Sequence, residues 1–323
     1  MPKRNKGLDY KIFKELKENK DYLSGQELAN KFKISRQGLW KHIKNLNDCG
    51  YKIEAIPRRG YKLKYSPDKP YPWEIKYKLG TKFIGCNVYF RQRVDSTQDF
   101  IWQLGQSGAP EGTIVIAESQ KKGKGRMGRS WFSPKGGLYL SCLFRPKKIL
   151  LKNISQISLV MALACIQAIE KETGVKLSLK WPNDIFFDKK KIGGILCQIN
   201  AEADKINFVA VGLGININTK KLPKETTSLF LERKNKFSLV IITKKIIEKM
   251  EQRYLEFESG EGKKLLAQWQ ERCFLWGNRL RVKVLDKTIE GEAAGIDQEG
   301  YLLVRRDNGL TEKISSGDVT KVM

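Results

Sequence analysis

The chain has 323 residues, of which 41% are hydrophobic and 30% charged, and its formal net charge is +26. This length predicts two or three domains. No apolar run reaches the roughly 18 residues of a membrane span, and no apolar signal core follows the basic residues 1–6, so we expect a cytoplasmic protein without membrane contact. The six cysteines form no C-x-x-C pair and His42 is the only histidine, which argues against a zinc site and a histidine-dependent nucleophile.

Positive charge is concentrated toward the N-terminus. Residues 1–65 hold 17 Lys/Arg against 7 Asp/Glu, a net charge of +10, while the remaining 258 residues carry +16. The denser charge predicts a phosphate-rich partner for this segment. The alternative, for the rest of the chain especially, is a general lysine bias of the organism's proteins.

Three helices and a two-stranded ribbon are expected in this segment, over residues 8–19, 25–31, 36–46, 51–56 and 61–65. Apolar residues recur at helical spacing in the first helix. Ser24 and Glu27 form a capping box before the second helix, and Ser35 offers a cap before the third. Two short helices joined by a tight turn and followed by a basic ribbon predict a winged helix-turn-helix.

The third helix and the turn of the ribbon carry the side chains that we expect to meet DNA. Arginine, lysine and glutamine contact bases and phosphates in a major groove. We therefore predict a DNA interface made of Ser35, Arg36, Gln37, Lys41, Lys44, Arg58 and Arg59. The alternative is a small helical domain that contacts another protein.

Beyond a Pro-rich stretch at residues 66–72, expected to be a linker or a stiff connection, the pattern changes twice. Alternating elements then predict an α+β domain with a mixed sheet. Its strands are expected at 113–118, 137–144, 177–180, 184–187, 192–199 and 206–217, and its helices at 98–104, 155–170, 238–258 and 262–271. Short strands at the end predict a small SH3-type barrel, over 279–285, 288–294, 301–306 and 311–314, with a hairpin turn at 307–309.

A glycine-rich basic loop at residues 120–131 carries the first chemical signal. Three glycines alternate there with three cations: Gly123, Lys124, Gly125, Arg126, Gly128 and Arg129. Close-approaching backbone N–H groups and fixed cations suit carboxylate and phosphate groups. The loop lacks the Walker A spacing and the following helix of a Rossmann fingerprint. The alternative is a plain basic surface loop.

Three further elements follow the loop. The segment Lys180-Trp181-Pro182-Asn183-Asp184 predicts a turn between two strands, after which Asp184 offers one carboxylate to a magnesium ion, although Asn and Asp also form plain turns. Residues 191–196 combine a lysine with two glycines. Residues 212–218 place glycines inside a β run, which often marks the close approach of a ligand.

These four elements, in this order and together with residues 95–98 and Gln120, resemble the catalytic domain of the biotin–protein ligases. The resemblance extends through the head to the bifunctional type, both ligase and biotin-operon repressor, at residues 24–28, 34–36, 41–43 and 60–61. It implies a multidomain α+β fold: a winged helix-turn-helix over residues 1–66, a central mixed α/β ligase domain of the class II synthetase-like type over 67–271, and a C-terminal SH3-like β-barrel over 272–323.

The resemblance implies a two-step reaction with biotin and ATP as substrates and Mg2+ as cofactor. Biotin is activated as biotinyl-5′-AMP and then transferred to a lysine of the biotin carboxyl carrier protein of a carboxylase such as acetyl-CoA carboxylase. The family also implies a homodimer, formed when the adenylate is bound, that represses biotin genes on operator DNA. The alternative is a biotin-sensing transcription factor with weak ligase activity. A lipoate or octanoate ligase on the related fold would lack the winged head and this loop.

The site residues are carried over from the matching positions. Those implied to be catalytic are Lys191, Arg126 and Asp184, with Asp184 also on the magnesium side. Those implied to bind biotin or the adenylate are Ser96, Thr97, Gln98, Gln120, Lys124, Gly125, Arg126, Trp131, Lys191, Gly212, Gly214 and Asn216. Structural alternatives stay open for three of them: a helix cap for Ser96, a solvated turn for Lys191 and core packing for Trp131.

Two positions depart from the family pattern. Position 124 is Lys where Arg is usual, which keeps the charge but loses the planar fork. Position 98 is Gln where Asn is usual, which moves the amide outward by roughly 1.5 Å. We expect a weaker grip on the adenylate at the first position and an altered biotin contact at the second.

Overall fold

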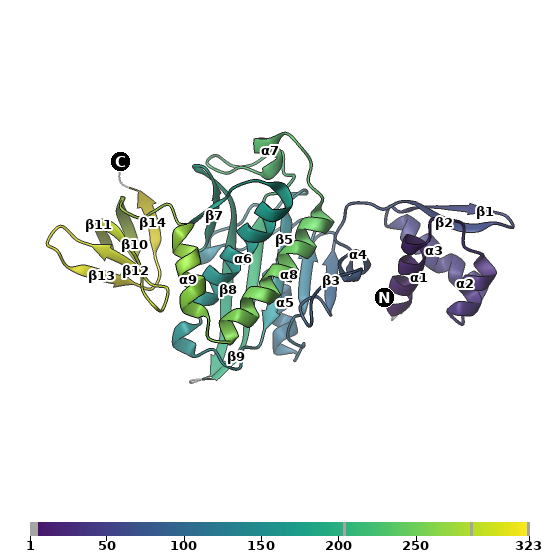
Figure 1. Ribbon diagram of the computed structural model, residues 1–323, viewed down its shortest axis with the longest axis horizontal. Helices are drawn as coiled ribbons and strands as arrows, with labels where there is room; N and C mark the ends of the chain where they lie inside the picture. The colour runs from purple at the N-terminus through teal and green to yellow at the C-terminus, as the bar shows by residue number, and fades with distance from the viewer. Residues whose placement is uncertain (1–5, 203–204, 285–286, 322–323) are drawn as a thin grey trace. The chain divides into compact units, whose positions relative to one another are not determined.

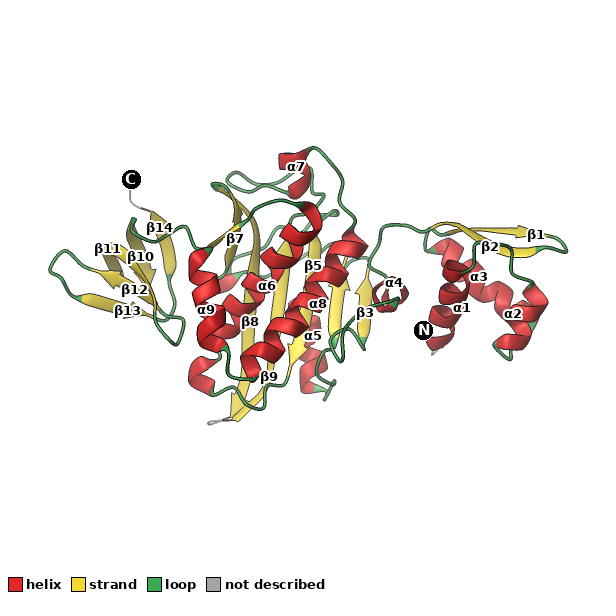
Figure 2. Cartoon of the chain, in the orientation of Figure 1, coloured by secondary structure: helices red, strands yellow, loops and turns green. Residues whose placement is uncertain are grey.

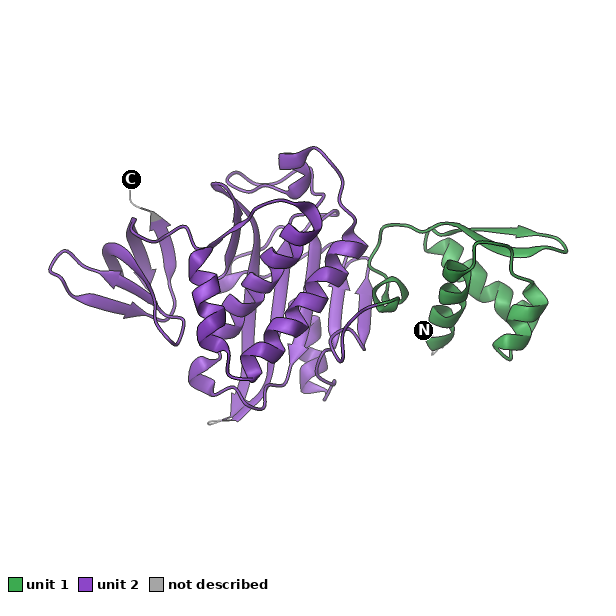
Figure 3. Cartoon of the chain, in the orientation of Figure 1, with its two compact units in different colours: residues 1–78 green, residues 79–323 purple. Residues whose placement is uncertain are grey.

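The computed structural model describes residues 6–202, 205–284 and 287–321. The chain divides into two units, residues 1–78 and 79–323 (Figure 3). No helix in the described part of the chain is both long and apolar enough to cross a membrane.

The first unit contains the predicted three helices and ribbon, followed by a short fourth helix (Figure 1). Its elements are α1 Lys6–Glu18, α2 Gly25–Lys31, α3 Arg36–Asp48, β1 Lys52–Ile56, β2 Gly60–Tyr65 and α4 Pro72–Lys76. Both predicted N-caps form, because Ser24 Oγ accepts the Glu27 N–H at 3.4 Å and Ser35 Oγ accepts the Gly38 N–H at 3.0 Å. The return bond from the Glu27 side chain, which would complete the capping box, does not occur among the described residues. The predicted order of helices and ribbon is confirmed.

The helix α4 was not predicted, and it packs onto the head. Its Glu74 is only 3% exposed, accepts the Tyr51 hydroxyl at 2.9 Å and pairs with Lys17. The Trp73 indole donates to the Tyr51 oxygen at 2.6 Å. A buried carboxylate needs such partners, so the chain after the Pro-rich stretch is an ordered part of the first unit rather than a free linker.

The second unit is built on a seven-stranded sheet with the order β3-β4-β5-β9-β8-β7-β6 (Figures 1 and 2). Its strands are β3 Val88–Arg91, β4 Ile114–Ala117, β5 Leu138–Phe144, β6 Ser178–Lys180, β7 Asp184–Phe187, β8 Lys190–Glu202 and β9 Lys205–Ile215. The pair β3–β4 is parallel and the other neighbours are antiparallel. The predicted mixed sheet is confirmed, with β3 as a strand that the sequence pattern did not reveal.

Helices cover both faces of this sheet (Figure 1). The helices are α5 Thr97–Gln106, α6 Gln156–Thr173, α7 Leu229–Arg233, α8 Leu239–Glu258 and α9 Gly262–Glu271. The long helices α6 and α8 pack on one face, and α6 is apolar nearly all round, as predicted. On the other face, Ile101 of α5 joins a buried cluster with Val115, Leu143, Phe208 and Ala210 of the sheet. The sheet is therefore buried on both sides at its centre.

A five-stranded antiparallel sheet, ordered β13-β12-β11-β10-β14, ends the second unit. Its strands are β10 Arg279–Val284, β11 Lys287–Ile296, β12 Leu302–Arg305, β13 Thr311–Ile314 and β14 Asp318–Lys321. The strand expected at 279–285 ends on Leu285, which lies outside the described residues, and β14 was not predicted. Among the contacts that join this sheet to the rest of the unit, Trp181 Nε1 donates to the Gly300 carbonyl at 3.0 Å, and Gln156 Nε2 of α6 donates to the Gln298 carbonyl at 2.9 Å.

Candidate active site and DNA-binding face

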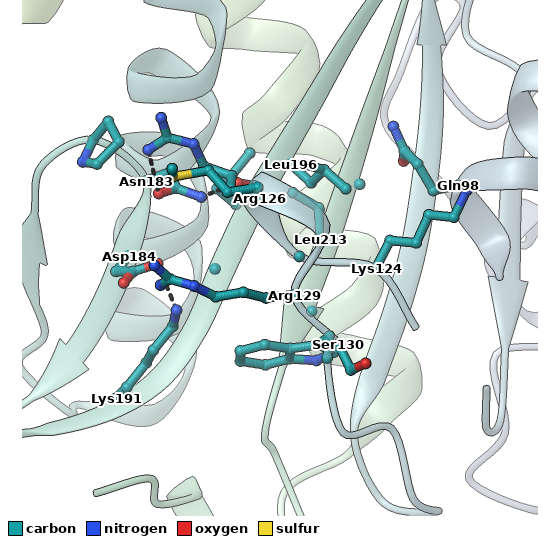
Figure 4. A pocket seen from close by; sticks show the side chains of 18 of the residues that line it. Gln98, Lys124, Arg126, Arg129, Ser130, Asn183, Asp184, Lys191, Leu196 and Leu213 are labelled. Atoms are coloured by element: carbon teal, nitrogen blue, oxygen red, sulfur yellow. Dashed lines mark hydrogen bonds and ion pairs between the residues drawn. The ribbon is translucent and has the colours of Figure 1, made fainter. Parts of the chain in front are cut away.

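A pocket opens on the α5 face of the seven-stranded sheet (Figure 4). Two directly opposed pairs on β8 and β9 form its floor, Gly194 with Gly214 and Leu196 with Gly212. These residues share a face because side chains alternate along a strand. The space between the lining residues amounts to about 920 Å³, part of which is open solvent at the mouth.

The pocket collects residues that are far apart in the sequence. Every predicted biotin- or adenylate-binding residue except Asn216 lines it, and so does Asp184. Asn216 is only 1% exposed, lies one position beyond β9, and is not among the lining residues. The binding roles of all these residues stay predictions.

The two predicted glycines of β9 make room for side chains of this chain. A Cβ on Gly214 would lie 2.4 Å from the Trp131 indole nitrogen, and a Cβ on Gly212 would lie 2.5 Å from Gln98 Oε1. Neither position tolerates a larger residue without moving its neighbour. The indole N–H of Trp131 is buried and has no hydrogen-bond partner among the described residues, so the pocket contains an unsatisfied donor.

Neutral polar groups line one end of the pocket. Thr97 donates to Gln120 Oε1 from its backbone N–H at 2.7 Å and from its hydroxyl at 3.0 Å. Ser96 caps α5, where its Oγ accepts the Gln98 and Asp99 N–H groups at 3.2 and 3.4 Å. The helix-cap alternative for Ser96 is thus correct, and Ser96 also lines the pocket.

Gln98 uses its longer side chain inside the protein. Its Nε2 donates to the Ala210 carbonyl at 2.9 Å, and its Oε1 lies 3.0 Å from the Ser141 hydroxyl. The side chain is 3% exposed. Both ends of the amide are therefore occupied by neighbouring strands, and the residue forms pocket wall as much as polar surface.

The opposite end of the pocket is ionic (Figure 4). Lys191 Nζ lies 2.7 Å from Asp184 Oδ1 and 5.3 Å from the centre of the Trp131 ring. Both side chains lie over Gly194, since a Cβ on Gly194 would lie 3.4 Å from Asp184 Oδ1 and 3.7 Å from Lys191 Nζ. Lys191 is 28% exposed and ion-paired, so it is not the fully solvated turn lysine of the alternative.

The glycine-rich loop folds back on itself beside this end. The Gly125 N–H donates to the Arg129 carbonyl at 2.7 Å, and the Trp131 N–H donates to the Gly123 carbonyl at 2.8 Å. Arg126 Nη1 donates to Asn183 Oδ1 at 3.3 Å. Burial lowers the pKa of Arg126, while the nearby Asp184 carboxylate acts in the opposite direction.

Lys124 lies away from the Asp184–Lys191 pair and forms an ion pair with Asp99 on α5 (Figure 4). Both partners are more than 40% exposed, so the pair is largely solvated and weak. The residue that departs from the family pattern is thus held by a carboxylate of its own chain.

Several lining residues were not among the predicted ones. Arg129 and Lys180 lie inside the sequence motifs but had no assigned role, whereas Gly317, Asp318 and Val319 come from β14 and the residue before it. Asp318 forms an ion pair with Arg129, which joins β14 to the loop. The place of Arg129 and Lys180 in these motifs could have identified them as pocket residues. Nothing in the sequence indicated that β14 reaches the pocket.

The predicted DNA-binding residues are exposed on the first unit. In α3, the side of the helix opposite the buried Leu39, Ile43 and Leu46 carries the exposed residues Ser35, Arg36, Gln37, Trp40, Lys41 and Lys44. Trp40, which was not predicted, is 51% exposed, with Lys44 Nζ 5.3 Å from its ring centre. His42 is part-buried and lies 2.6 Å from Asp9, which links α3 to α1. The arrangement leaves one continuous cationic and aromatic face on α3.

The ribbon is attached rigidly to the start of α2. Leu23 and Tyr61 exchange two backbone hydrogen bonds of 2.9 Å. Gly60 has a φ of 109°, and a Cβ there would lie 1.9 Å from the Leu23 carbonyl oxygen, so only glycine fits. The guanidinium of Arg59 lies 4.3 Å from the centre of the Tyr22 ring, and Arg58 is exposed at the turn. The two arginines therefore have different surroundings.

Comparison with known proteins agrees with this architecture. Residues 90–216 match the biotin/lipoate A/B protein ligase family, residues 10–62 an HTH domain, and residues 277–322 the biotin protein ligase C-terminal domain. The bifunctional ligase/repressor BirA of Bacillus spizizenii is 35% identical over 306 residues, which cover 93% of this chain and 94% of that protein. The BirA of Escherichia coli is 27% identical over 308 residues, 94% of each chain.

Solved structures give the same result. The biotin protein ligase from Aquifex aeolicus in complex with biotin and ATP matches with a TM-score of 0.65 and 29% identity, covering 73% of this chain and 99% of that one. A second crystal structure of the Aquifex aeolicus enzyme has a TM-score of 0.62 and 27% identity, covering 75% and 99%. The relative from Bacillus extends the match through the N-terminal head. The chain therefore belongs to the family of bifunctional biotin ligase/repressors.

Proposed function

We propose that this chain is a biotin–[biotin carboxyl carrier protein] ligase that also represses transcription in response to biotin. The observation that carries the enzymatic half is the meeting of four separate segments at one pocket: the start of α5, the loop 120–131, the β6–β7 turn and the glycine-bearing floor of β8 and β9. The pocket has neutral amides and hydroxyls at one end, where the one cation Lys124 is paired with Asp99, and its other cations lie toward the opposite end (Figure 4). This suits a hydrogen-bonding ring that carries an anionic tail.

The neutral end is proposed to hold the biotin ring. Ser96, Thr97 and Gln120 place hydroxyl and amide groups on its wall. The apolar floor residue Leu196 and the glycines opposite it allow a flat ligand to lie against the sheet. Gln98 contributes its amide group as part of the pocket wall, because both polar atoms of that amide are already hydrogen-bonded to neighbouring strands.

The ionic end is proposed to hold the biotin carboxylate and the α-phosphate of ATP. A carboxylate oxygen attacks the α-phosphorus, and the bond from phosphorus to the pyrophosphate oxygen breaks. Lys191 and Arg126 bring the two anions together by offsetting their mutual repulsion, and no protein side chain forms a covalent bond. The rate gain then comes from positioning and from charge stabilisation. A lysine amine of the carrier next attacks the acyl carbon, and AMP leaves.

Magnesium is proposed to enter with the phosphates of ATP. No cluster of three His, Cys, Asp or Glu side chains that suits a resident metal occurs among the described residues. Asp184 offers a carboxylate at the ionic end of the floor, and its Oδ1 is ion-paired with Lys191. Mg2+ typically takes one or two carboxylate oxygens and completes its shell with phosphates and waters, which fits the remaining oxygen of Asp184.

The first unit is proposed to bind operator DNA as one half of a homodimer that forms when the adenylate is bound. The exposed face of α3 and the Arg58/Arg59 turn are the proposed contact surfaces. We further propose a cytoplasmic location, an SH3-like form for the C-terminal sheet and a class II synthetase-like form for the central domain. Relatives named as bifunctional ligase/repressors match this chain over both the head and the ligase segments, which supports the proposal that one chain has both functions.

One experiment separates the proposed ligase from a biotin-sensing regulator with weak ligase activity. The full chain is charged with radiolabelled biotin and ATP, freed of excess ATP, and mixed with a carrier domain in a single turnover. We expect transfer of the label to the carrier lysine. A stable adenylate without transfer supports the regulator instead. A gel shift on the upstream region of biotin genes, with and without biotin and ATP, tests repression independently.

A further inference from the structure

Five cationic side chains line the pocket: Lys124, Arg126, Arg129, Lys180 and Lys191. Three of them form ion pairs with aspartates. Arg126 and Lys180 form no ion pair within the described part of the chain, and Arg126 is hydrogen-bonded to Asn183. Lys180 is the one of these two cations whose side chain has neither an ion-pair partner nor a hydrogen-bond partner among the described residues.

Lys180 is also held in place. It is the last residue of β6, directly opposite Asp184 in the β6–β7 ladder. Its neighbours on both sides are anchored, since the Leu179 N–H donates to the Arg272 carbonyl at 2.8 Å and the Trp181 indole is bonded to Gly300. A side chain on such a strand is presented in a defined position rather than on a mobile loop.

The surroundings of Lys180 are partly apolar. The side chain is half-buried, and its Nζ lies 5.7 Å from the centre of the Phe186 ring. Burial lowers the pKa of the Lys180 ammonium, and the nearby cations Lys191 and Arg129 lower it further. The Asp184 carboxylate acts in the opposite direction. A partly desolvated ammonium without an ion-pair partner is costly, and such groups in clefts are candidates for ligand binding.

The order of strands indicates which part of the ligand reaches Lys180. From the neutral end, the pocket crosses β9, β8 and β7 before it reaches β6, the edge strand. Strands are about 4.8 Å apart, so Lys180 lies on the order of 14 Å across the sheet from the glycines of β9. Lys191 and Asp184 lie between these two ends. A ring bound at the neutral end and an α-phosphate at Lys191 leave the edge of the sheet for the remaining phosphates.

We propose that Lys180 binds the β- and γ-phosphates of ATP and stabilises the charge that develops on pyrophosphate as it leaves. The proposal rests on the ligase reaction proposed above. When the phosphorus–oxygen bond breaks, its electron pair stays on the departing pyrophosphate, whose negative charge grows. Lysine is a compact point charge that suits phosphate groups. The paired cations can take up this charge only by giving up their aspartates, whereas Lys180 has no such pair to break.

The two half-reactions provide the test, because pyrophosphate takes part only in the first. The Lys180→Met variant of the full chain is assayed for biotin-dependent exchange of pyrophosphate into ATP. It is assayed separately for transfer to a carrier domain from supplied biotinyl-5′-AMP. We expect exchange to fall by about 10²–10³-fold, with a higher KM for ATP, while transfer from the supplied adenylate and calorimetric biotin binding stay within twofold. Lys180→Arg is expected to restore part of the exchange.

Lys176→Met is the matched control, since Lys176 is an exposed lysine four positions earlier that does not line the pocket. It should leave both half-reactions unchanged. Unchanged exchange in Lys180→Met, or an equal loss in both half-reactions, overturns the proposal. If Lys180→Met does not fold, the pH dependence of the exchange rate decides. The loss of exchange activity at high pH should move to higher pH in Lys180→Arg, and an unchanged pH profile contradicts the assignment. Absence of exchange in the wild-type chain would instead reject the ligase reaction itself.

Discussion

Lys191 Nζ lies 2.7 Å from Asp184 Oδ1, and this pair lies over the glycine floor of the pocket. The pair holds the ammonium in the pocket before any substrate is bound. Lys191→Met should lower biotin-dependent pyrophosphate exchange by about 10²–10³-fold, because it removes charge stabilisation at the reacting phosphate. Asp184→Asn keeps the shape and the lysine charge but releases the lysine, so a smaller loss of about tenfold is expected. Equal losses in the two variants would indicate that the proposed contact of the Asp184 carboxylate with magnesium contributes as much to the reaction as the Lys191 charge.

The Lys124–Asp99 pair predicts a gain of function. If Lys124 turns to the adenylate when the ligand binds, it first leaves Asp99. The pair is exposed and worth about 0.2–1 kcal/mol, so Asp99→Asn should slow adenylate dissociation by up to about fivefold. Stopped-flow chase with unlabelled adenylate measures this rate. Lys124→Arg is the companion variant, and it should also slow dissociation. If neither variant changes the rate, position 124 does not contact the adenylate.

Gln98 is expected to matter for stability as well as for biotin. In Gln98→Asn the amide is shorter and no longer reaches the Ala210 carbonyl, to which it now donates at 2.9 Å. Ala210 lies in the interior strand β9, whose backbone groups also pair in the sheet, so the loss is that of one net hydrogen bond, about 0.5–1.5 kcal/mol. Urea unfolding of the second unit, followed by tryptophan fluorescence, gives the free energy of unfolding. A variant as stable as the wild type would mean that water or a backbone shift replaces the bond.

The cationic face of α3 predicts a salt-dependent effect on DNA binding. Lys41→Ala removes one exposed cation from the proposed interface. Log–log plots of operator affinity against salt should lose about 0.9 from the slope for each lost phosphate contact. Exchange activity should be unaffected, because the substitution is outside the second unit. Lys11, exposed on α1, provides a control position at which Ala should leave the slope unchanged.

The first unit should lose stability in strong alkali. Burial raises the pKa of Tyr51 well above its ordinary range, and the Glu74 carboxylate adds to this. A group whose folded pKa is raised contributes stability that is present below its unfolded pKa, here about 10, and is lost as the pH rises further. The denaturation midpoint of the head should therefore fall above pH 10 more steeply in the wild type than in Tyr51→Phe. Identical slopes would place the titrating group elsewhere.

The sequence predicted the local features well because they depend on short-range rules. The caps at Ser24 and Ser35 and the apolar helix α6 follow from spacing alone, and the structure has them where expected. The grouping of Lys191 and Asp184 with the loop came from family resemblance rather than from spacing. Their convergence depends on the β7–β8 and β8–β9 registers, which no local pattern encodes.

The features that escaped prediction depend on tertiary contacts. The short helix α4 forms directly after the Pro-rich stretch because Glu74 and Trp73 have partners in the head. The strand β14 has only four residues and is stabilised by pairing with β10. Its ion pair between Asp318 and Arg129 depends on this tertiary pairing, which the short polar segment does not indicate in the sequence. The engagement of Gln98 by Ala210 likewise required knowing which strand lies beneath α5.

Biotin-dependent exchange of labelled pyrophosphate into ATP tests the central claim most directly, because it requires the pocket to bind biotin and ATP together and to form the mixed anhydride reversibly. The full chain should catalyse exchange only when biotin is present, and Lys191→Met should abolish most of it. Exchange that is absent, or that proceeds equally well without biotin, would contradict the assignment of this pocket to biotin activation.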